Sequence, residues 1–178
     1  MNNIDIKTQD LSKRLKYHTK GDNISCVEDV NPPIFVLPFI MNANGKNINQ
    51  LFLHEYKDMF DELKTTVLDI NQYNFDTNLD VVNSFISKYF SIPDSKIELD
   101  RIFYLGEMNI DISLFKTKTI CYGANLTGLL RDDEMSINLH NSDHSKMVRV
   151  QYYDVMKGHY LDNMIMASTF QLMSYFMI

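Results

Sequence analysis

The chain has 178 residues, a length typical of one domain with a substantial core. Apolar residues make up 45% of it, which indicates a folded globular protein. The formal net charge of -6 argues against a nucleic-acid-binding protein, because such a protein needs a dense basic surface. No apolar stretch reaches the roughly 20 residues of a membrane span. Residues 1–10 have no apolar signal core, so we expect no export.

The composition also bears on source and on cysteine chemistry. Asn, Ile, Asp, Lys, Met and Tyr are plentiful, while Gly and Pro are scarce and Trp is absent. This bias fits an AT-rich genome, such as that of a low-GC bacterium or its phage. Cys26 and Cys121 stand apart in the sequence, so we expect two reduced thiols in a cytosolic-type protein.

The first 30 residues are predicted to be an N-terminal arm or a loosely attached first strand. They are polar, with only two short apolar patches, and we expect them to become ordered against a neighbouring protein. Asn31-Pro32-Pro33 is the clearest break in the sequence. The compact domain is therefore predicted to cover residues 31–178.

A hairpin is predicted at the start of this domain. Residues 34–41 (IFVLPFIM) are continuously apolar, which favours a strand buried on both faces. Pro38 cannot donate to a ladder, so we expect an edge or a bulge there. Residues 42–46 (NANGK) favour a turn, because Asn-Gly tolerates positive φ. Residues 48–56 are the predicted return strand.

The next segments are predicted to be a polar crossover over residues 57–64, which a helical turn could form, then a strand over 65–70, and a helix. Six apolar residues of the helix recur at spacings of three and four and form one stripe. They are Leu79, Val82, Phe85, Ile86, Tyr89 and Phe90. Thr77 or Asp76 can cap its start, and Pro93 ends it.

The second half is predicted to alternate strands with loops before a terminal helix. The predicted strands cover residues 98–109, 116–126 and 146–155, with an interruption at Gly106 and an acidic loop at 129–134. The terminal helix is predicted over residues 161–177, with Asp162 near its start. Strands grouped around a central and a terminal helix indicate an α+β sandwich.

This order of elements resembles the Nudix fold, and the C-terminal part is most similar to the ADP-ribose pyrophosphatase branch. The resemblance covers about residues 31–178 and rests on element order and hydrophobic pattern. It implies an α/β/α sandwich with a central mixed sheet and a C-terminal helix. The Nudix signature, Gx5Ex7REUxEExGU with U apolar, falls on residues 70–92 of this sequence.

The packing positions of that signature are retained. Its two U positions hold Ile86 and Ile92, while its two Gly positions hold Ile70 and Ser91. The first Glu position holds Asp76, the single acidic match, which is more simply a helix cap than a metal ligand.

The chemical positions are lost. The Arg-Glu pair is replaced by Ser84-Phe85 and the Glu-Glu pair by Lys88-Tyr89. In the family, carboxylates on this helix hold divalent cations against a pyrophosphate and help to activate water. We therefore predict no enzyme activity, no catalytic residue, no metal site and no cofactor.

Several other residues were weighed as sites against plainer interpretations. Asp132-Asp133-Glu134 is expected to be a solvated loop. His140 and His144, with Asp143, have ligand spacing only if helical, and Asn-Ser-Asp favours a loop. Adjacent strand residues point to opposite faces, so His54 and Glu55 are a poor catalytic pair.

The remaining candidates have packing as their plainer role. Cys121 lacks a nucleophile motif, and Gly123-Ala124-Asn125 lacks the features of a phosphate loop. Phe35, Tyr104 and Tyr122 could stack a base. Met164, Met166, Met173 and Met177 either pack the terminal helix or form a partner surface.

These observations leave three functional hypotheses. The first is a non-catalytic module that serves as a structural or interaction subunit, resembling connector or tail-ring proteins of a large tailed phage. It would reside in the virion, or otherwise in the cytoplasm, and would contact protein partners through residues 1–30. The second is a sensor that binds a nucleotide or ADP-ribose without cleaving it. The third is a hydrolase whose carboxylates have moved to Asp76, Glu107 and Asp132-Asp133-Glu134.

Overall fold

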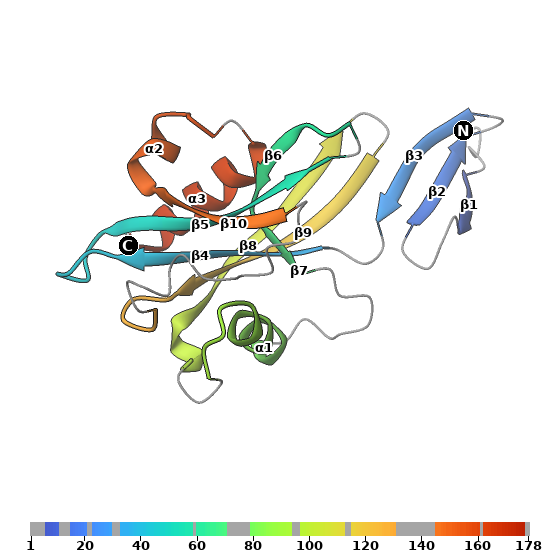
Figure 1. The fold of residues 1–178 in the computed structure, drawn as a ribbon. Helices are drawn as coiled ribbons and strands as arrows, with labels where there is room; N and C mark the ends of the chain where they lie inside the picture. The colour runs from blue at the N-terminus through green and yellow to red at the C-terminus, as the bar shows by residue number, and fades with distance from the viewer. Residues whose placement is uncertain are drawn as a thin grey trace.

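A computed structural model of the chain describes residues 6–10, 15–20, 23–29, 33–58, 60–70, 79–93, 97–112, 115–130, 145–160 and 162–176. A mixed sheet forms its middle layer (Figure 1). Helix α1 (Leu79–Tyr89) covers one face, while α2 (Tyr152–Met156) and α3 (Asn163–Phe176) cover the other. The predicted α+β sandwich with a central mixed sheet and a C-terminal helix is confirmed. Within the described ranges, no helix has the length and apolar character needed to cross a membrane.

The predicted hairpin is present. Strands β4 (Ile34–Met41) and β5 (Ile48–Lys57) pair antiparallel. In the turn between them, Gly45 has a φ of 66°, and its N–H donates to the carbonyl of Asn42 at 2.8 Å. The side-chain Oδ1 of Asn42 also accepts from the N–H of Lys46 at 3.2 Å. The Asn-Gly turn chemistry therefore fixes the hairpin, as the sequence indicated.

The expectation of an edge or a bulge at Pro38 is wrong. Strand β4 lies inside the sheet, because it pairs in parallel with β9 (Phe115–Asn125) along one side. On its other side the pairing passes from β7 (Leu68–Ile70), which reaches Val36, to β5, which begins at Phe39. Pro38 lies between these two partners, where its missing amide hydrogen removes no ladder bond. The register shift falls between Ile40 and Met41.

Residues 57–64 do not form the predicted crossover. Strand β5 continues to Lys57, and β6 (Leu63–Thr66) turns back to pair with it antiparallel. Asp58 closes the turn, since its Oδ1 accepts from the N–H of Phe60 at 2.8 Å and of Glu62 at 3.0 Å. An aspartate that bonds the backbone two residues on replaces the helical turn that we expected. The predicted strand over residues 65–70 is consequently split between β6 and β7.

The next two strands match their predictions closely. Strand β8 (Ile102–Ile112) follows a short 3-10 turn, η2 (Leu99–Arg101), and pairs antiparallel with β9. The interruption predicted at Gly106 is a register shift at that residue, where φ is 133°. Glycine reaches this φ without strain, so the shift is encoded locally.

The predicted strand over residues 146–155 ends earlier than expected. Strand β10 (Ser145–Gln151) pairs with β5, and the chain then turns into α2 at Tyr152. The terminal helix α3 is confirmed. Asp162 caps it, because its Oδ1 accepts from the N–H groups of Met164 at 2.9 Å and Ile165 at 3.0 Å.

The N-terminal segment contains three strands. Strands β1 (Ile6–Asp10), β2 (Leu15–Lys20) and β3 (Asn23–Asp29) form an antiparallel meander (Figure 1). Strand β3 also pairs in parallel with β9, joining Val27–Asp29 to Phe115–Thr117. This pairing within one chain differs from the expectation that the segment orders only against a neighbour, because backbone groups pair even where side chains are polar. The domain division at residue 31 stays a prediction.

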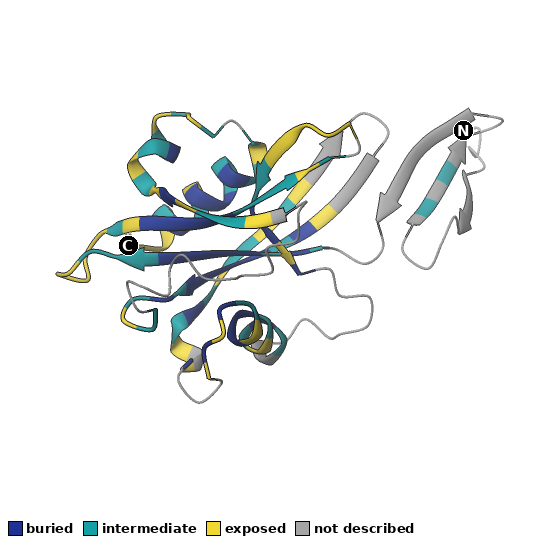
Figure 2. Ribbon diagram, viewed as in Figure 1, coloured by how far each residue is buried: buried dark blue, intermediate teal, exposed yellow. Residues whose placement is uncertain are grey.

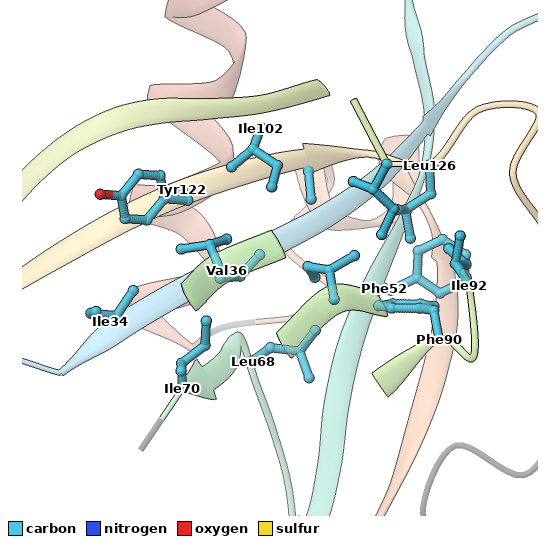
Figure 3. Close-up of a cluster of buried hydrophobic side chains, with 14 residues drawn as sticks. Ile34, Val36, Phe52, Leu68, Ile70, Phe90, Ile92, Ile102, Tyr122 and Leu126 are labelled. Atoms are coloured by element: carbon cyan, nitrogen blue, oxygen red, sulfur yellow. The ribbon is translucent and has the colours of Figure 1, made fainter. Parts of the chain in front are cut away.

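Two hydrophobic clusters hold the helices on the sheet (Figure 2). In β4, Val36 belongs to the cluster beneath α1, and its neighbour Leu37 belongs to the cluster beneath α2 and α3. Figure 3 shows the α1 cluster, where the Phe52 and Phe90 rings meet edge to face at 5.3 Å. Alternation along one buried strand therefore supplies both cores.

Candidate functional site

Helix α1 ends in a motif that places a residue in the left-handed region. Ser91 has a φ of 52°. The N–H of Ile92 donates to the carbonyl of Ser87 at 2.9 Å, and the N–H of Ser91 donates to that of Lys88 at 3.4 Å. This pair of bonds defines a Schellman cap. The Ser87 hydroxyl also donates to the carbonyl of Ile92. The predicted end of the helix before Pro93 is therefore confirmed, and the cap shows how the helix ends.

The face of α1 that corresponds to the signature carboxylates carries two stacked rings. The ring centroids of Phe85 and Tyr89 lie 5.1 Å apart with 29° between the ring planes. Both side chains are partly buried and pack against the cluster beneath α1. Burial raises the pKa of the Tyr89 phenol, so it is neutral at physiological pH. Lys88, between them in sequence, is exposed.

Most of the other acidic and histidine candidates lie outside the described residues. These are Asp76, Asp132, Asp133, Glu134, His140, Asp143 and His144. Within the part of the chain that the structure describes, no group of three or more His, Cys, Asp or Glu side chains could hold a metal ion.

Glu107 was the remaining candidate for a relocated carboxylate. It forms an ion pair with Lys118 on the exposed ribbon of β8 and β9. The hydrogen bond from Lys118 raises the pKa of that ammonium group. A carboxylate that pairs with an ammonium group is a poor cation ligand, because a cation site needs oxygen ligands whose negative charge is not already compensated.

His54 and Glu55 have separate partners, as the sequence predicted. The His54 ring lies 5.5 Å from the Tyr56 ring, and burial lowers the pKa of His54. The Glu55 carboxylate instead pairs with Lys146 of β10 at 2.7 Å. Adjacent residues of β5 thus serve opposite faces of the sheet.

Cys121 and Gly123 are packing residues of β9. Burial raises the pKa of the Cys121 thiol to about 11, and its Sγ donates to the Oγ of Ser168 at 3.3 Å. A thiol with this pKa is not a nucleophile at neutral pH. A Cβ on Gly123 would lie 3.1 Å from a Leu172 methyl group, so Gly123 allows α3 to approach the sheet. Gly123-Ala124-Asn125 is therefore strand, not phosphate loop.

The three aromatics considered for base stacking do not come together. Phe35 packs on the α3 face of the sheet, whereas Tyr122 belongs to the cluster on the α1 face. Tyr104 joins Tyr122 edge to face at 5.6 Å and is 50% exposed. Phe35 and Tyr122 therefore have the packing role that was the plainer interpretation, on opposite faces of the sheet. Of the three, only Tyr104 and Tyr122 contact each other, and Tyr122 is 5% exposed.

The methionines of α3 differ in their surroundings. Met164 and Met166 pack partly buried against the cluster beneath α3, and Met173 is also partly buried. Met177 lies outside the described residues. Packing of α3, the plainer interpretation, is confirmed for the first two.

Comparison with known proteins identifies the fold. No family model and no curated protein matches this sequence. Among solved structures, the chain is similar to one described as "Crystal structure of ADP compounds hydrolase", with a TM-score of 0.54 and 10% identity. That likeness covers 96% of this chain and 91% of the other. The fold is Nudix-like.

Helix α1 and its C-terminal cap contain the residues that the sequence resemblance assigns to the signature helix. Ile86 and Ile92 are 0% and 4% exposed, so both apolar signature positions pack against the sheet. Ser91 stands where the signature has its second Gly, and it keeps the positive φ that glycine favours. The sequence showed only that serine replaces glycine here, because serine gives no signal of a left-handed backbone.

We expect Ser91→Gly to raise the free energy of unfolding by about 0.5–1 kcal/mol. Glycine removes a left-handed strain of about 1–2 kcal/mol, and its greater freedom in the unfolded chain offsets part of this gain. Ser84→Gly, at an exposed site inside the same helix, is the matched control and should lower stability by about 0.5–1 kcal/mol. Urea unfolding measures both, and two losses of equal size would contradict the cap.

Proposed function

We propose that this chain is a non-catalytic Nudix-like domain that serves as a structural or interaction subunit of a larger assembly. The observation that carries the proposal is the stacked pair of Phe85 and Tyr89, 5.1 Å apart, at signature positions that hold glutamates in the family. The helix is intact, and its apolar positions are occupied. What differs is the chemistry of the face that would meet a pyrophosphate.

That face lacks the charges that metal-assisted hydrolysis requires. Cations such as Mg²⁺ are held by carboxylate oxygens, and the bound cation then activates water and neutralises phosphate. Phe85 has no ligand atom, and burial keeps the Tyr89 phenol neutral. An ammonium group such as that of Lys88 repels a single positive charge 4 Å away by roughly 1–4 kcal/mol, and a divalent cation by more.

A domain of this kind acts through its surfaces. Three large apolar side chains at separate positions, Phe60, Leu63 and Tyr153, are 77%, 62% and 65% exposed. Contact through residues 1–30, and a place in a phage particle such as its connector or tail ring, are narrower forms of the proposal. The AT-rich compositional bias is compatible with a phage, as it is with a low-GC bacterium. Presence of the protein in purified particles tests the phage assignment.

Turnover tests the loss of catalysis. The full chain is incubated with ADP-ribose and Mg²⁺ or Mn²⁺, and release of AMP is followed beside an active Nudix hydrolase as positive control. We expect release at the rate of the buffer alone, because no carboxylate stands on the α1 face between residues 81 and 89. Metal-dependent release would contradict the proposal and favour relocated carboxylates.

A binding sensor is the second candidate, and the half-exposed ring of Tyr104, which lies edge to face on the buried Tyr122, favours it. Melting curves with and without ADP-ribose separate it from a purely structural domain. A ligand that binds only the folded state raises the melting temperature by mass action. A rise without turnover that is lost in Tyr104→Ala favours the sensor, whereas an unchanged melting temperature favours the structural domain.

A further inference from the structure

Helix α3 is unusual for a helix on the surface of an acidic protein. Its 14 residues include no charged side chain, although the chain carries a net charge of -6. Ile165 and Leu172, which face the sheet, are fully buried. The outward side of a surface helix normally carries charged residues. The outward side of α3 is therefore suited to contact with another uncharged surface.

The outward side has a regular stripe centred on Phe170. The side chain of Phe170 is 50% exposed. Met166 and Ala167 lie four and three residues before it, and Met173 and Ser174 lie three and four residues after it. Residues at these spacings share one helical face. Both methionines and Ala167 are partly exposed, and Ser174 is exposed. Met166 lies at the margin of the stripe, since it also packs against the cluster beneath α3.

We propose that two copies of this chain associate through α3, with the helices antiparallel about a twofold axis at Phe170. In such an arrangement, residues at equal distances on either side of position 170 face one another. Met166 then faces Ser174, and Met173 faces Ala167. Each large side chain meets a small one, so the stripe is complementary to itself in volume.

The absence of charge on α3 also bears on the choice of occupant. Two molecules of net charge -6 repel one another at long range, but contact through α3 brings no like-charged side chains together. A partner helix with charged flanks would find no opposite charge on α3, whereas an identical helix brings none. The absence of charged side chains on both helices therefore favours a second copy over a foreign helix with charged flanks.

The polar group in the stripe does not oppose burial. The Ser174 hydroxyl donates to the carbonyl of Phe170 within the same helix at 2.9 Å, so contact with Met166 leaves no unpaired donor. Phe170 supplies an aromatic anchor at the centre, and the flexible methionines adapt around it. Since α3 and α1 cover opposite faces of the sheet (Figure 1), the inference goes beyond the proposed function and holds whether or not the chain hydrolyses a substrate.

Sedimentation velocity of the full chain over a range of concentrations tests the association. We expect a reversible dimer for the wild type. Phe170→Glu places two like charges beside the axis and should weaken the dimer on the order of 100-fold. Phe170→Lys should do the same, and an equimolar mixture of the two variants should form a heterodimer. Phe60→Glu, at a 77% exposed phenylalanine in the β5–β6 turn, is the control and should dimerise like the wild type.

Each other result would overturn the inference. If the wild type stays monomeric at every concentration, the chain does not form the proposed dimer. If Phe170→Glu leaves the dimer unchanged, the interface lies elsewhere. If the mixture of the Phe170→Glu and Phe170→Lys variants stays monomeric, the two copies do not meet about a twofold axis at position 170. Circular dichroism checks that the variants fold. Ala167→Leu, a neutral change that occupies the space for Met173 of the second copy, should also weaken the dimer.

Discussion

Replacing Phe39 by alanine is expected to lower the free energy of unfolding by about 3–5 kcal/mol. Phe39 is fully buried at the centre of the sheet, where β4 pairs with β5 and β9. Its ring meets those of Phe103 at 6.3 Å and Phe176 at 5.6 Å. Alanine removes these contacts and leaves a cavity that paired strands on both sides cannot close.

Phe60→Ala is the matched control for this loss. Phe60 is 77% exposed in the turn between β5 and β6, so the same change should alter stability by no more than about 0.5 kcal/mol. Urea unfolding of both variants, with the slope of each transition compared, gives the two values. Equal losses would show that the burial of Phe39 is not what stabilises the sheet.

Ile86→Ala is expected to lower the free energy of unfolding by about 2–4 kcal/mol. Ile86 is fully buried beneath α1, in the cluster that also contains Val82 and Phe90. Loss of the buried methyl groups outweighs the higher helix propensity of alanine, which returns less than about 1 kcal/mol. The variant tests whether this apolar signature position still seats the helix on the sheet.

Ser84→Ala gives the comparison within the same helix. Ser84 is exposed, so alanine should leave stability unchanged or raise it by about 0.5 kcal/mol through helix propensity. Thermal and urea unfolding of the pair separate packing from propensity. A loss in Ser84→Ala as large as that in Ile86→Ala would contradict a helix held by one buried face.

Local pattern predicted much of the fold, and the misses have both local and long-range causes. The hairpin and the stop of α1 were predicted because Asn-Gly and Pro93 act over a few residues. The turn closed by Asp58 was missed, since a polar run allows either a helical turn or an Asx turn. The N-terminal strands were predicted only as an arm or a loosely attached first strand, because short half-polar strands such as β2 and β3 depend on pairing with their neighbours.

The candidate site was predicted in residue type but not in geometry. The replacement of glutamates by Phe85 and Tyr89 could be read directly from the sequence. Their stacking against each other, and the left-handed Ser91, could not, because rotamers and backbone angles depend on packing beneath the helix. The sequence also could not separate Phe35 from Tyr122, because the register of the strands sets which face of the sheet each side chain occupies.

Turnover of ADP-ribose by the wild type and by two variants tests the central claim most directly. Asp76→Asn removes the single acidic match to the signature, and the combined change of Phe85, Lys88 and Tyr89 to glutamate restores the others. With Mg²⁺ in excess, we predict that wild type and Asp76→Asn both release AMP at the rate of the buffer alone. Metal-dependent release by the wild type that is lost in Asp76→Asn would contradict the account, whatever the restored variant does.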